Sequence, residues 1–329
     1  MRVKYMKTTV ALAASLIAAG VTAPLLSAQG GNSPRAATGV ASSDQPLATY
    51  PPTAGFNPLT ASAAELAQNH FPPRPTAGPA LTAWDATYGR ATHYVPPDPV
   101  QGTTLVAPPL ATSSSTSPAG SYNSLNSGDW TGYFITESST LAQATWEQVP
   151  VHAGTDTNYK TAPQVAFWTG LGGVTSPQYL IQAGASSIST SPSAQYRFWT
   201  EDAPLAPDYE GPVIRPYQYA FVSVQYEGSD STLYFLENTT TGDYSDFVND
   251  TPDVELNTTD FIAESPPAIA TWPDWGETTF TGCTGSTLAL QPGQSDTEVF
   301  MYSSSGILRG TPGPVNPAND GFNVWWKSA

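Results

Sequence analysis

The chain has 329 residues, with 11 basic and 27 acidic side chains and a formal net charge of −16. The acidity lies in the C-terminal part, because residues 126–329 hold five Lys and Arg against 23 Asp and Glu. This balance excludes nucleic acid as a partner, since phosphate binding requires a basic face. It favours work in acid, where carboxylates lose their charge and few cations remain to repel one another. We expect residues 126–329 to be most stable between about pH 2 and 5 and destabilised near neutrality.

Residues 1–28 have the pattern of an export signal. A basic start with Arg2, Lys4 and Lys7 precedes a short apolar run that ends at Leu26, and small residues for cleavage follow. No other segment is long and apolar enough to span a bilayer. The sequence therefore predicts a secreted, extracellular protein without a membrane partner.

Residues 29–125 are rich in Ala, Pro, Ser, Thr and Gly. One helix is expected within "TASAAELAQNHF" (60–71), before "PPRP" ends it. Trp84, Tyr88 and Tyr94 indicate that the segment docks on another part of the chain. The Ser- and Thr-rich stretch that follows is typical of an exposed cleavage region, expected between about residues 112 and 127. We interpret 29–125 as a propeptide and linker that is inhibitory and removed in acid, with a plain linker as the alternative.

From Trp130 onward the pattern is typical of β-strands. "YAFVSVQY" (219–226) alternates apolar residues on one face, "EGSD" predicts a turn and "STLYFLEN" returns. Turns with Pro or Gly recur, and neither a helical period nor a fixed repeat is visible. Residues 126–329 are therefore predicted to form an all-β, antiparallel two-sheet sandwich of the concanavalin A-like or jelly-roll type. Cys283 is the only cysteine, which rules out an intrachain disulfide and a cysteine-based zinc site.

The motifs that are absent from this region limit the kinds of catalytic residue that it can use. Its one histidine is His152, expected at the surface, and the motifs GxSxG, HExxH, DTG and DSG are absent. Carboxylates, amides and tyrosines remain for acid–base work. Glu264 ends the apolar stretch "TDFIAE" on the face of Ile262, where burial can raise its pKa. Gln182 in "LIQAG" is an amide that is costly to bury unpaired. Alone, Glu264 could equally be an ordinary strand-end carboxylate, and Gln182 a residue on a solvated face.

Several ordered segments, from about Asp129 to the C-terminus, resemble the glutamic peptidases of the eqolisin family, family G1. "GDWTGYF" is similar to the family's opening strand, which usually reads Asn-Trp, and "ATWEQVP" to the strand after it. "FWTGLGG" is similar to Trp-Val-Gly-Ile-Asp-Gly, and "LIQAG" to the Leu-Gln-Thr-Gly segment that carries the catalytic glutamine. "FWTEDAP", "FLENTTTG", "TDFIAE" and "FTGC" match later family segments.

The resemblance implies an acid endopeptidase in which Gln182 and Glu264 face each other across a cleft and share one water. Glu264 would be the general base and then the general acid, while the Gln182 amide donates to the oxyanion. Candidate substrate-binding residues are Trp130, Trp168, Trp199 and Glu201, and each tryptophan could instead belong to the sandwich core.

The implied partners are polypeptide substrates and the chain's own propeptide. We expect a monomer with no cofactor and no metal, and no inhibition by pepstatin. Departures from the family pattern are Gly172 and Ser186, where Asp is usual, and Asp202 and Ala203, where aromatic residues are usual. The substrate pockets are therefore expected to differ.

Two alternatives remain open. In a carbohydrate-active sandwich, Glu201 and Glu264 would be the two carboxylates of a glycosidase and tryptophans would stack on sugars. That interpretation gives Gln182 no role. A non-catalytic surface or adhesion domain is the second alternative, and the retention of both Gln182 and Glu264 argues against it.

Overall fold

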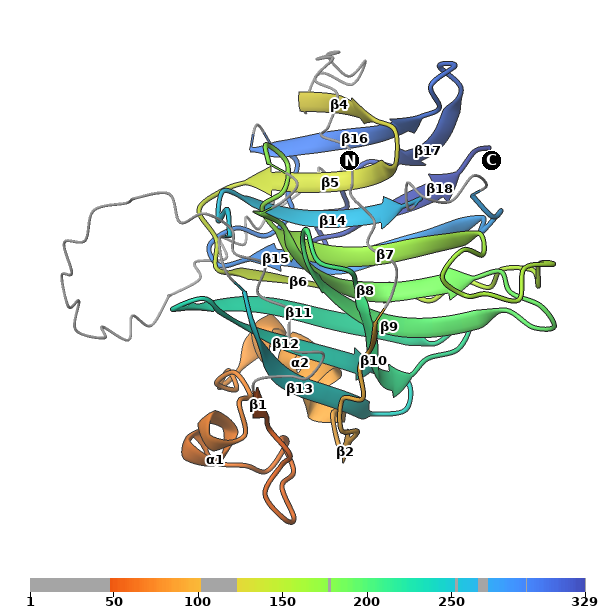
Figure 1. Ribbon diagram of the computed structural model, residues 1–329. Helices are drawn as coiled ribbons and strands as arrows, with labels where there is room; N and C mark the ends of the chain where they lie inside the picture. The colour runs from red at the N-terminus through yellow and green to blue at the C-terminus, as the bar shows by residue number, and fades with distance from the viewer. Residues whose placement is uncertain are drawn as a thin grey trace, which may run out of the picture. The chain divides into compact units, whose positions relative to one another are not determined.

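The computed structural model describes residues 48–101, 123–176, 179–251, 254–265, 272–293 and 295–328 (Figure 1). These belong to one compact unit, Ser42–Ala329. The predicted export signal and most of the predicted cleavage region lie outside the described residues. No helix in the described ranges has the length and apolar character needed to cross a bilayer.

One layer of the protein is here called sheet A, and its strands come from residues between 100 and 302. Its strands, in spatial order, are β4 (Asn123–Ser127), β16 (Asp296–Tyr302), β5 (Trp130–Thr136), β14 (Thr258–Glu264), β7 (Gln164–Leu171), β8 (Ile181–Ile188), β9 (Gln195–Asp202), β10 (Asp208–Val213) and β3 (Val100–Gln101). Only β4 and β16 pair in parallel. The strands from β4 to β10 stack in this order in Figure 1.

The second layer is here called sheet B. Its strands, in spatial order, are β17 (Leu308–Pro312), β18 (Phe322–Trp326), β15 (Glu277–Gly285), β6 (Leu141–Glu147), β11 (Tyr219–Gly228), β12 (Ser231–Asn238) and β13 (Asp243–Asp250). Pairing of β16 with β17 links the two sheets. Two short strands, β1 (Ala48–Thr49) and β2 (His93–Tyr94), add to β13. The antiparallel β-sandwich expected from the sequence is confirmed.

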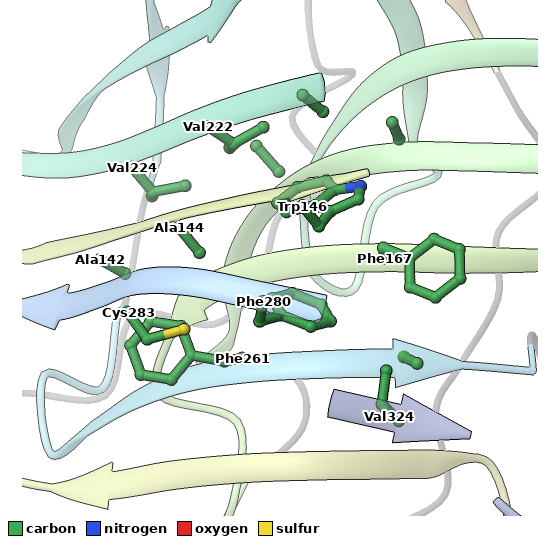
Figure 2. Packing of buried hydrophobic residues seen from close by; sticks show 14 of the residues in the cluster. Ala142, Ala144, Trp146, Phe167, Val222, Val224, Phe261, Phe280, Cys283 and Val324 are labelled. Carbon is green, nitrogen blue, oxygen red and sulfur yellow. The ribbon is translucent and has the colours of Figure 1, made fainter. Parts of the chain in front are cut away.

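Alternate residues of both sheets fill the space between them. On β7, Val165 and Phe167 belong to this inner core, whereas Trp168 belongs to a separate cluster on the outer face of sheet A. Val222 and Val224 of β11 point inward as the alternating pattern predicted, and Figure 2 shows them near Trp146 and Cys283. The period of two along each strand explains this division.

Sheet A is unusual because its central strands are buried on both faces. Every residue of β7, β8 and β14 is buried. The polar residues of the outer face are therefore withdrawn from water. Strand β8 begins at Ile181, which belongs to the inner core, whereas Leu180 just before it packs in the outer cluster.

The N-terminal segment 48–101 folds onto the outer face of sheet B. It contains α1 (Ala63–Gln68), α2 (Gly78–Thr87) and a 3-10 turn, η1 (Tyr88–Arg90). Helix α1 confirms the expected helix and begins with a capping box between Ser62 and Glu65. Helix α2 was not anticipated.

The docking that the aromatic residues indicated is also observed. Phe71, Trp84 and Tyr88 form a buried cluster with Phe235 and Tyr244 of sheet B. The role of the segment as a propeptide stays a prediction.

Candidate active site

The outer face of sheet A gathers the residues that the motifs singled out. Register puts Ile262, Trp168, Gly184 and Trp199 in one cross-strand row over β14, β7, β8 and β9. An added Cβ on Gly184 would lie 2.7 Å from Trp168 Cβ and 2.9 Å from Trp199 Cζ2, so only glycine lets the two tryptophans converge there. Trp130 joins them in the outer cluster. All three tryptophans therefore line this face and do not belong to the inner core.

Glu264 ends β14 beside these rings. It lies opposite Trp130 on one side and Ala166 on the other, and is 6% exposed. Its Oε2 accepts a hydrogen bond from Trp168 Nε1 at 2.8 Å. The Trp168 ring in turn meets the Trp130 ring edge to face, with centroids 5.0 Å apart. Two rigid indoles thus fix the position of the carboxyl group.

Burial raises the pKa of Glu264 above its usual value, and the nearby charge of Asp129 raises it further. The hydrogen bond from Trp168 opposes this rise because it stabilises the charged form. The site therefore favours the protonated acid while providing one donor for the carboxylate.

Gln182 lies on β8, opposite Gly170 and Glu201, and is 5% exposed. Its Nε2 donates to Glu201 Oε2 at 2.7 Å. Its Oε1 has no hydrogen-bond partner among the described residues. The amide is thus held by one of its two N–H groups, which leaves the second N–H for another acceptor.

Strand β7 separates Gln182 from Glu264. Gln182 is opposite Gly170 and Glu264 is opposite Ala166, and Trp168 stands between these positions on the same face. Burial and then the charge of Glu264 raise the pKa of Glu201 well above its usual value. Gln182 and Glu264 therefore lie on one face as expected. Gln182 is hydrogen-bonded to Glu201, however, and Glu264 is hydrogen-bonded to Trp168.

Sequence reasoning missed the role of Asp129, which precedes β5. Its Oδ1 accepts from Ser127 Oγ at 2.9 Å, and its backbone oxygen accepts from the amide of Ser265, the residue after Glu264. Burial raises its own pKa. The signal was present, because the aspartate stands where the family usually has Asn and an amide would add no charge beside Glu264.

Asp260 is a second missed carboxyl group. It is fully buried on β14, on the same face as Glu264 and opposite Gly170, the neighbour of Gln182. Its Oδ1 has no partner among the described residues, and burial raises its pKa well above the usual value. The period of two in "TDFIAE" could have placed it on the same face as Glu264.

The departures from the family pattern fall in different surroundings. Gly172 has φ +80°, and an added Cβ would lie 2.2 Å from Glu255 O, so an aspartate does not fit its turn. Ser186 is buried on the outer face, opposite Ala166 and Arg197. Asp202 instead accepts a hydrogen bond from Tyr234, an inner-core residue.

His152 is exposed, as expected. No group of three or more His, Cys, Asp or Glu in the described ranges is arranged to hold a metal ion.

Comparison with known protein families agrees with these motifs. The sequence model of the Peptidase A4 family matches residues 128–307. Scytalido-glutamic peptidase, solved with a transition state analog inhibitor, has a TM-score of 0.49 at 17% identity over 61% of this chain and 98% of that chain. Aspergilloglutamic peptidase from Aspergillus niger has a TM-score of 0.44 at 21% identity over 50% and 99%.

SCP-B, an eqolisin solved with the tripeptide Ala-Ile-His, has a TM-score of 0.47 at 17% identity over 61% of this chain and 98% of that chain. A search of curated proteins finds no match. The family match spans more than half of the chain, so this protein belongs to the Peptidase A4 family, the glutamic endopeptidases also called eqolisins or family G1.

Proposed function

We propose that this endopeptidase is secreted, works in acid and uses Gln182 and Glu264 to activate one water. The observation that carries the proposal is the pair of fixed side chains on the outer face of sheet A. Trp168 holds the Glu264 carboxyl group at 2.8 Å, and Glu201 holds the Gln182 amide at 2.7 Å. Family membership favours peptide hydrolysis over the carbohydrate-active and adhesion alternatives.

The proposed reaction begins with ionised Glu264 taking a proton from the water. The water oxygen forms a bond to the scissile carbonyl carbon, and the carbonyl oxygen takes up the negative charge. The free N–H of the Gln182 amide donates to that oxyanion. Glu264 then gives its proton to the leaving nitrogen as the C–N bond breaks. Glu201 is a positioning residue here, because it acts only by orienting Gln182.

An amide suits this role because it donates at every working pH, whereas a carboxylate at the same place would repel the oxyanion. Loss of one such donor costs about 100- to 1,000-fold in rate in other hydrolases. The buried surroundings of Gln182 strengthen the interaction, since little water competes for the N–H group.

The raised pKa of Glu264 has a consequence for the pH profile. The base must be ionised, so kcat/KM rises with pH through the pKa of Glu264 in the free enzyme. The fold opposes this trend, because burial also raises the pKa of Glu210 to about 8 and of Asp296 to about 7. The stability that such groups contribute to the fold is lost as pH rises toward their folded pKa. The proposed activity in acid therefore comes from the fraction of Glu264 that is ionised below its pKa, and the loss of stability sets the upper pH limit of the enzyme.

Secretion and zymogen maturation are also proposals. The export pattern of residues 1–28 supports the first, and the docking of residues 48–101 supports the second. The contacts of residues 48–101 described above are with sheet B and with the edge strand β10. This part of the segment therefore supports the fold of the precursor, and inhibition would require contacts beside Glu264 and Gln182.

The test measures hydrolysis of denatured casein by the acid-treated full chain, with pepstatin present. We expect Glu264→Gln and Gln182→Ala each to lose about 100-fold or more in kcat. The exposed Glu227 and Gln225 of β11 supply matched controls, Glu227→Gln and Gln225→Ala, which should retain activity. Near wild-type turnover in either site variant would refute the dyad. The Glu264→Gln precursor should also stay uncut in acid, and its cutting would refute self-processing.

A further inference from the structure

A cross-strand row leads from Glu264 to a basic residue on the same outer face. Glu264 is opposite Ala166 on β7, Ala166 is opposite Ser186 on β8, and Ser186 is opposite Arg197 on β9. Three strand spacings make this path about 14 Å long. An extended peptide covers that distance in about four residues. Only two small side chains lie between the proposed base and the arginine.

Arg197 is held in place by aromatic rings. Its guanidinium carbon lies 4.7 Å from the Tyr159 ring centroid and 6.0 Å from that of Tyr209. Its Nε donates to Gln195 Oε1 at 3.3 Å. Stacking of this kind fixes the planar guanidinium while leaving its other N–H groups available for a carboxylate.

The charge around Arg197 is also unusual for this domain. The ion pairs within the described parts of the chain are Arg74 with Asp85 and His93 with Asp243, so Arg197 has no carboxylate partner there. The ammonium of Lys160 lies 5.9 Å from the centroid of the same Tyr159 ring. Two of the five cations of residues 126–329 therefore meet at one tyrosine, in a domain with 23 carboxylates.

An extended segment of this chain already lies beside Arg197. Strand β3 pairs antiparallel with β10, with Val100 opposite Tyr209. Asp98, two residues earlier, lines one pocket together with Arg197 and Tyr209. Addition of a strand to a sheet edge is a general way to bind an extended peptide. The N-terminal segment thus shows how a peptide brings a carboxylate to this pocket.

We propose that Arg197, seated on Tyr159 and Tyr209, is a specificity-determining residue that binds an acidic side chain of the polypeptide substrate. Asp98 lines this subsite in the precursor without forming an ion pair with Arg197. The inference rests on the proposed peptidase function of the same face. Substrates with Asp or Glu about four residues from the scissile bond are preferred over those with Asn or Gln. Ser186, directly opposite Arg197, brings no negative charge, and Glu210 of the same pocket accepts a hydrogen bond from Thr200 and forms no ion pair with Arg197.

The test uses the full chain with Asp98→Ala, which removes the internal carboxylate from the pocket. Quenched fluorescent peptides carry Asp at each position in turn, each with an Asn-matched partner. We expect kcat/KM to be about 10- to 100-fold higher for Asp at one position, as for a hydrogen bond to a charged group. Arg197→Gln should abolish this preference. Arg215→Gln, at an exposed arginine in the β10–β11 connection, should retain it.

Ser186→Asp provides a second, independent variant. It would give Arg197 a carboxylate directly opposite it on β8, at a Cβ separation of about 5 Å, and should remove the preference without removing the arginine. No preference for Asp in the parent chain would overturn the proposal. A preference that persists in Arg197→Gln would also overturn it.

A binding experiment separates this proposal from the peptidase function. The same labelled peptides are titrated into the Glu264→Gln, Asp98→Ala chain and followed by fluorescence anisotropy. Tighter binding of Asp over Asn peptides that disappears with Arg197→Gln supports the subsite, even if no variant cleaves any peptide. Equal binding of Asp and Asn peptides overturns the subsite, even if cleavage is observed.

Discussion

The outer faces of sheet A and sheet B both contain buried carboxyl groups, but the surroundings of these groups differ. On sheet A, Glu264 accepts a hydrogen bond from Trp168 of the neighbouring strand, and Asp260 is fully buried opposite Phe134 and Gly170. On sheet B, Glu237 and Asp246 are fully buried, and none of their carboxyl oxygens has a hydrogen-bond partner among the described residues. They lie next to the rings that pack against the N-terminal segment, because Asp246 is opposite Phe235.

Burial of carboxyl groups has a different consequence on each of the two faces. Burial raises the pKa of Glu237 well above its usual value, against the charge of Arg90, and raises that of Asp246 to about 8. On sheet A the same effect gives the proposed base its proton affinity. On sheet B it makes docking of residues 48–101 dependent on protons, since an ionised carboxylate without partners is costly to bury. Acid therefore favours both the docking of residues 48–101 on the outer face of sheet B and the folded state of the domain.

The largest expected effect comes from truncating Phe71, which packs between residues 48–101 and the outer face of sheet B. Phe71 lies with its ring centroid 5.5 Å from that of Phe235 and 5.6 Å from that of Tyr244. Phe71→Ala should lower the free energy of unfolding at pH 4 by about 3 kcal/mol, as large-to-small core substitutions do. Urea denaturation checks this value. Leu59→Ala, at an exposed residue of the same segment, should cost less than about 0.5 kcal/mol.

Hydrogen exchange at pH 4 should show faster exchange of the β13 amides in Phe71→Ala. If Phe71→Ala unfolds like the parent chain, residues 48–101 are not part of the cooperative fold.

The next effect concerns the pH dependence of the buried carboxyl groups on sheet B. The folded pKa of Asp246 is about 8 against a usual 3.8, so its contribution to stability is present below about pH 4 and is lost as pH rises toward 8. Asp246→Asn removes this loss. We expect it to raise the free energy of unfolding by about 2 kcal/mol at about pH 5.5 and to leave it nearly unchanged at pH 3. Equilibrium urea unfolding at both pH values is the measurement.

Glu237→Gln should behave in the same direction, and the exposed Glu227→Gln serves as its control on the neighbouring strand. A parent chain whose melting temperature rises steadily from pH 4 to 7 would contradict this account of both sheet faces. It would mean that partners compensate the buried carboxylates.

A smaller effect is expected at Asp129. Its charge is one cause of the raised pKa of Glu264, so Asp129→Asn should lower that pKa. The rising limb of the kcat/KM profile should move by about one pH unit toward acid. The profile is measured with one neutral quenched peptide for both enzymes. An unchanged rising limb would show that another group controls it.

Much of this architecture could be predicted from the sequence where the signal is local. The alternation of Val222 and Val224 placed the inner face of β11, and the apolar positions before "PPRP" placed α1. Helix α2 was missed because its N-cap, Ala77, makes no side-chain cap and the helix depends on packing of Trp84. Tertiary packing decides such a segment more than its own propensity.

The candidate site divides in the same way. Ordered motifs identified Gln182 and Glu264, but the partners of these residues follow from strand register, which no short motif contains. Glu201 holds Gln182 because β9 pairs with β8, and the effect of Asp129 on Glu264 follows from the pairing of β5 with β14. Effects of burial on pKa values likewise require the packed structure.

The most direct test of the central claim is the pH profile of kcat for Gln182→Glu in the full chain. A protonated carboxylic acid can donate to the oxyanion and an ionised one repels it, so this variant should hydrolyse casein only at low pH. We expect its activity to fall by about 100-fold as pH rises through the pKa of the introduced carboxyl group, while Gln182→Ala is inactive throughout. A profile for Gln182→Glu that coincides with that of the parent enzyme would contradict the assignment of Gln182 as the oxyanion donor.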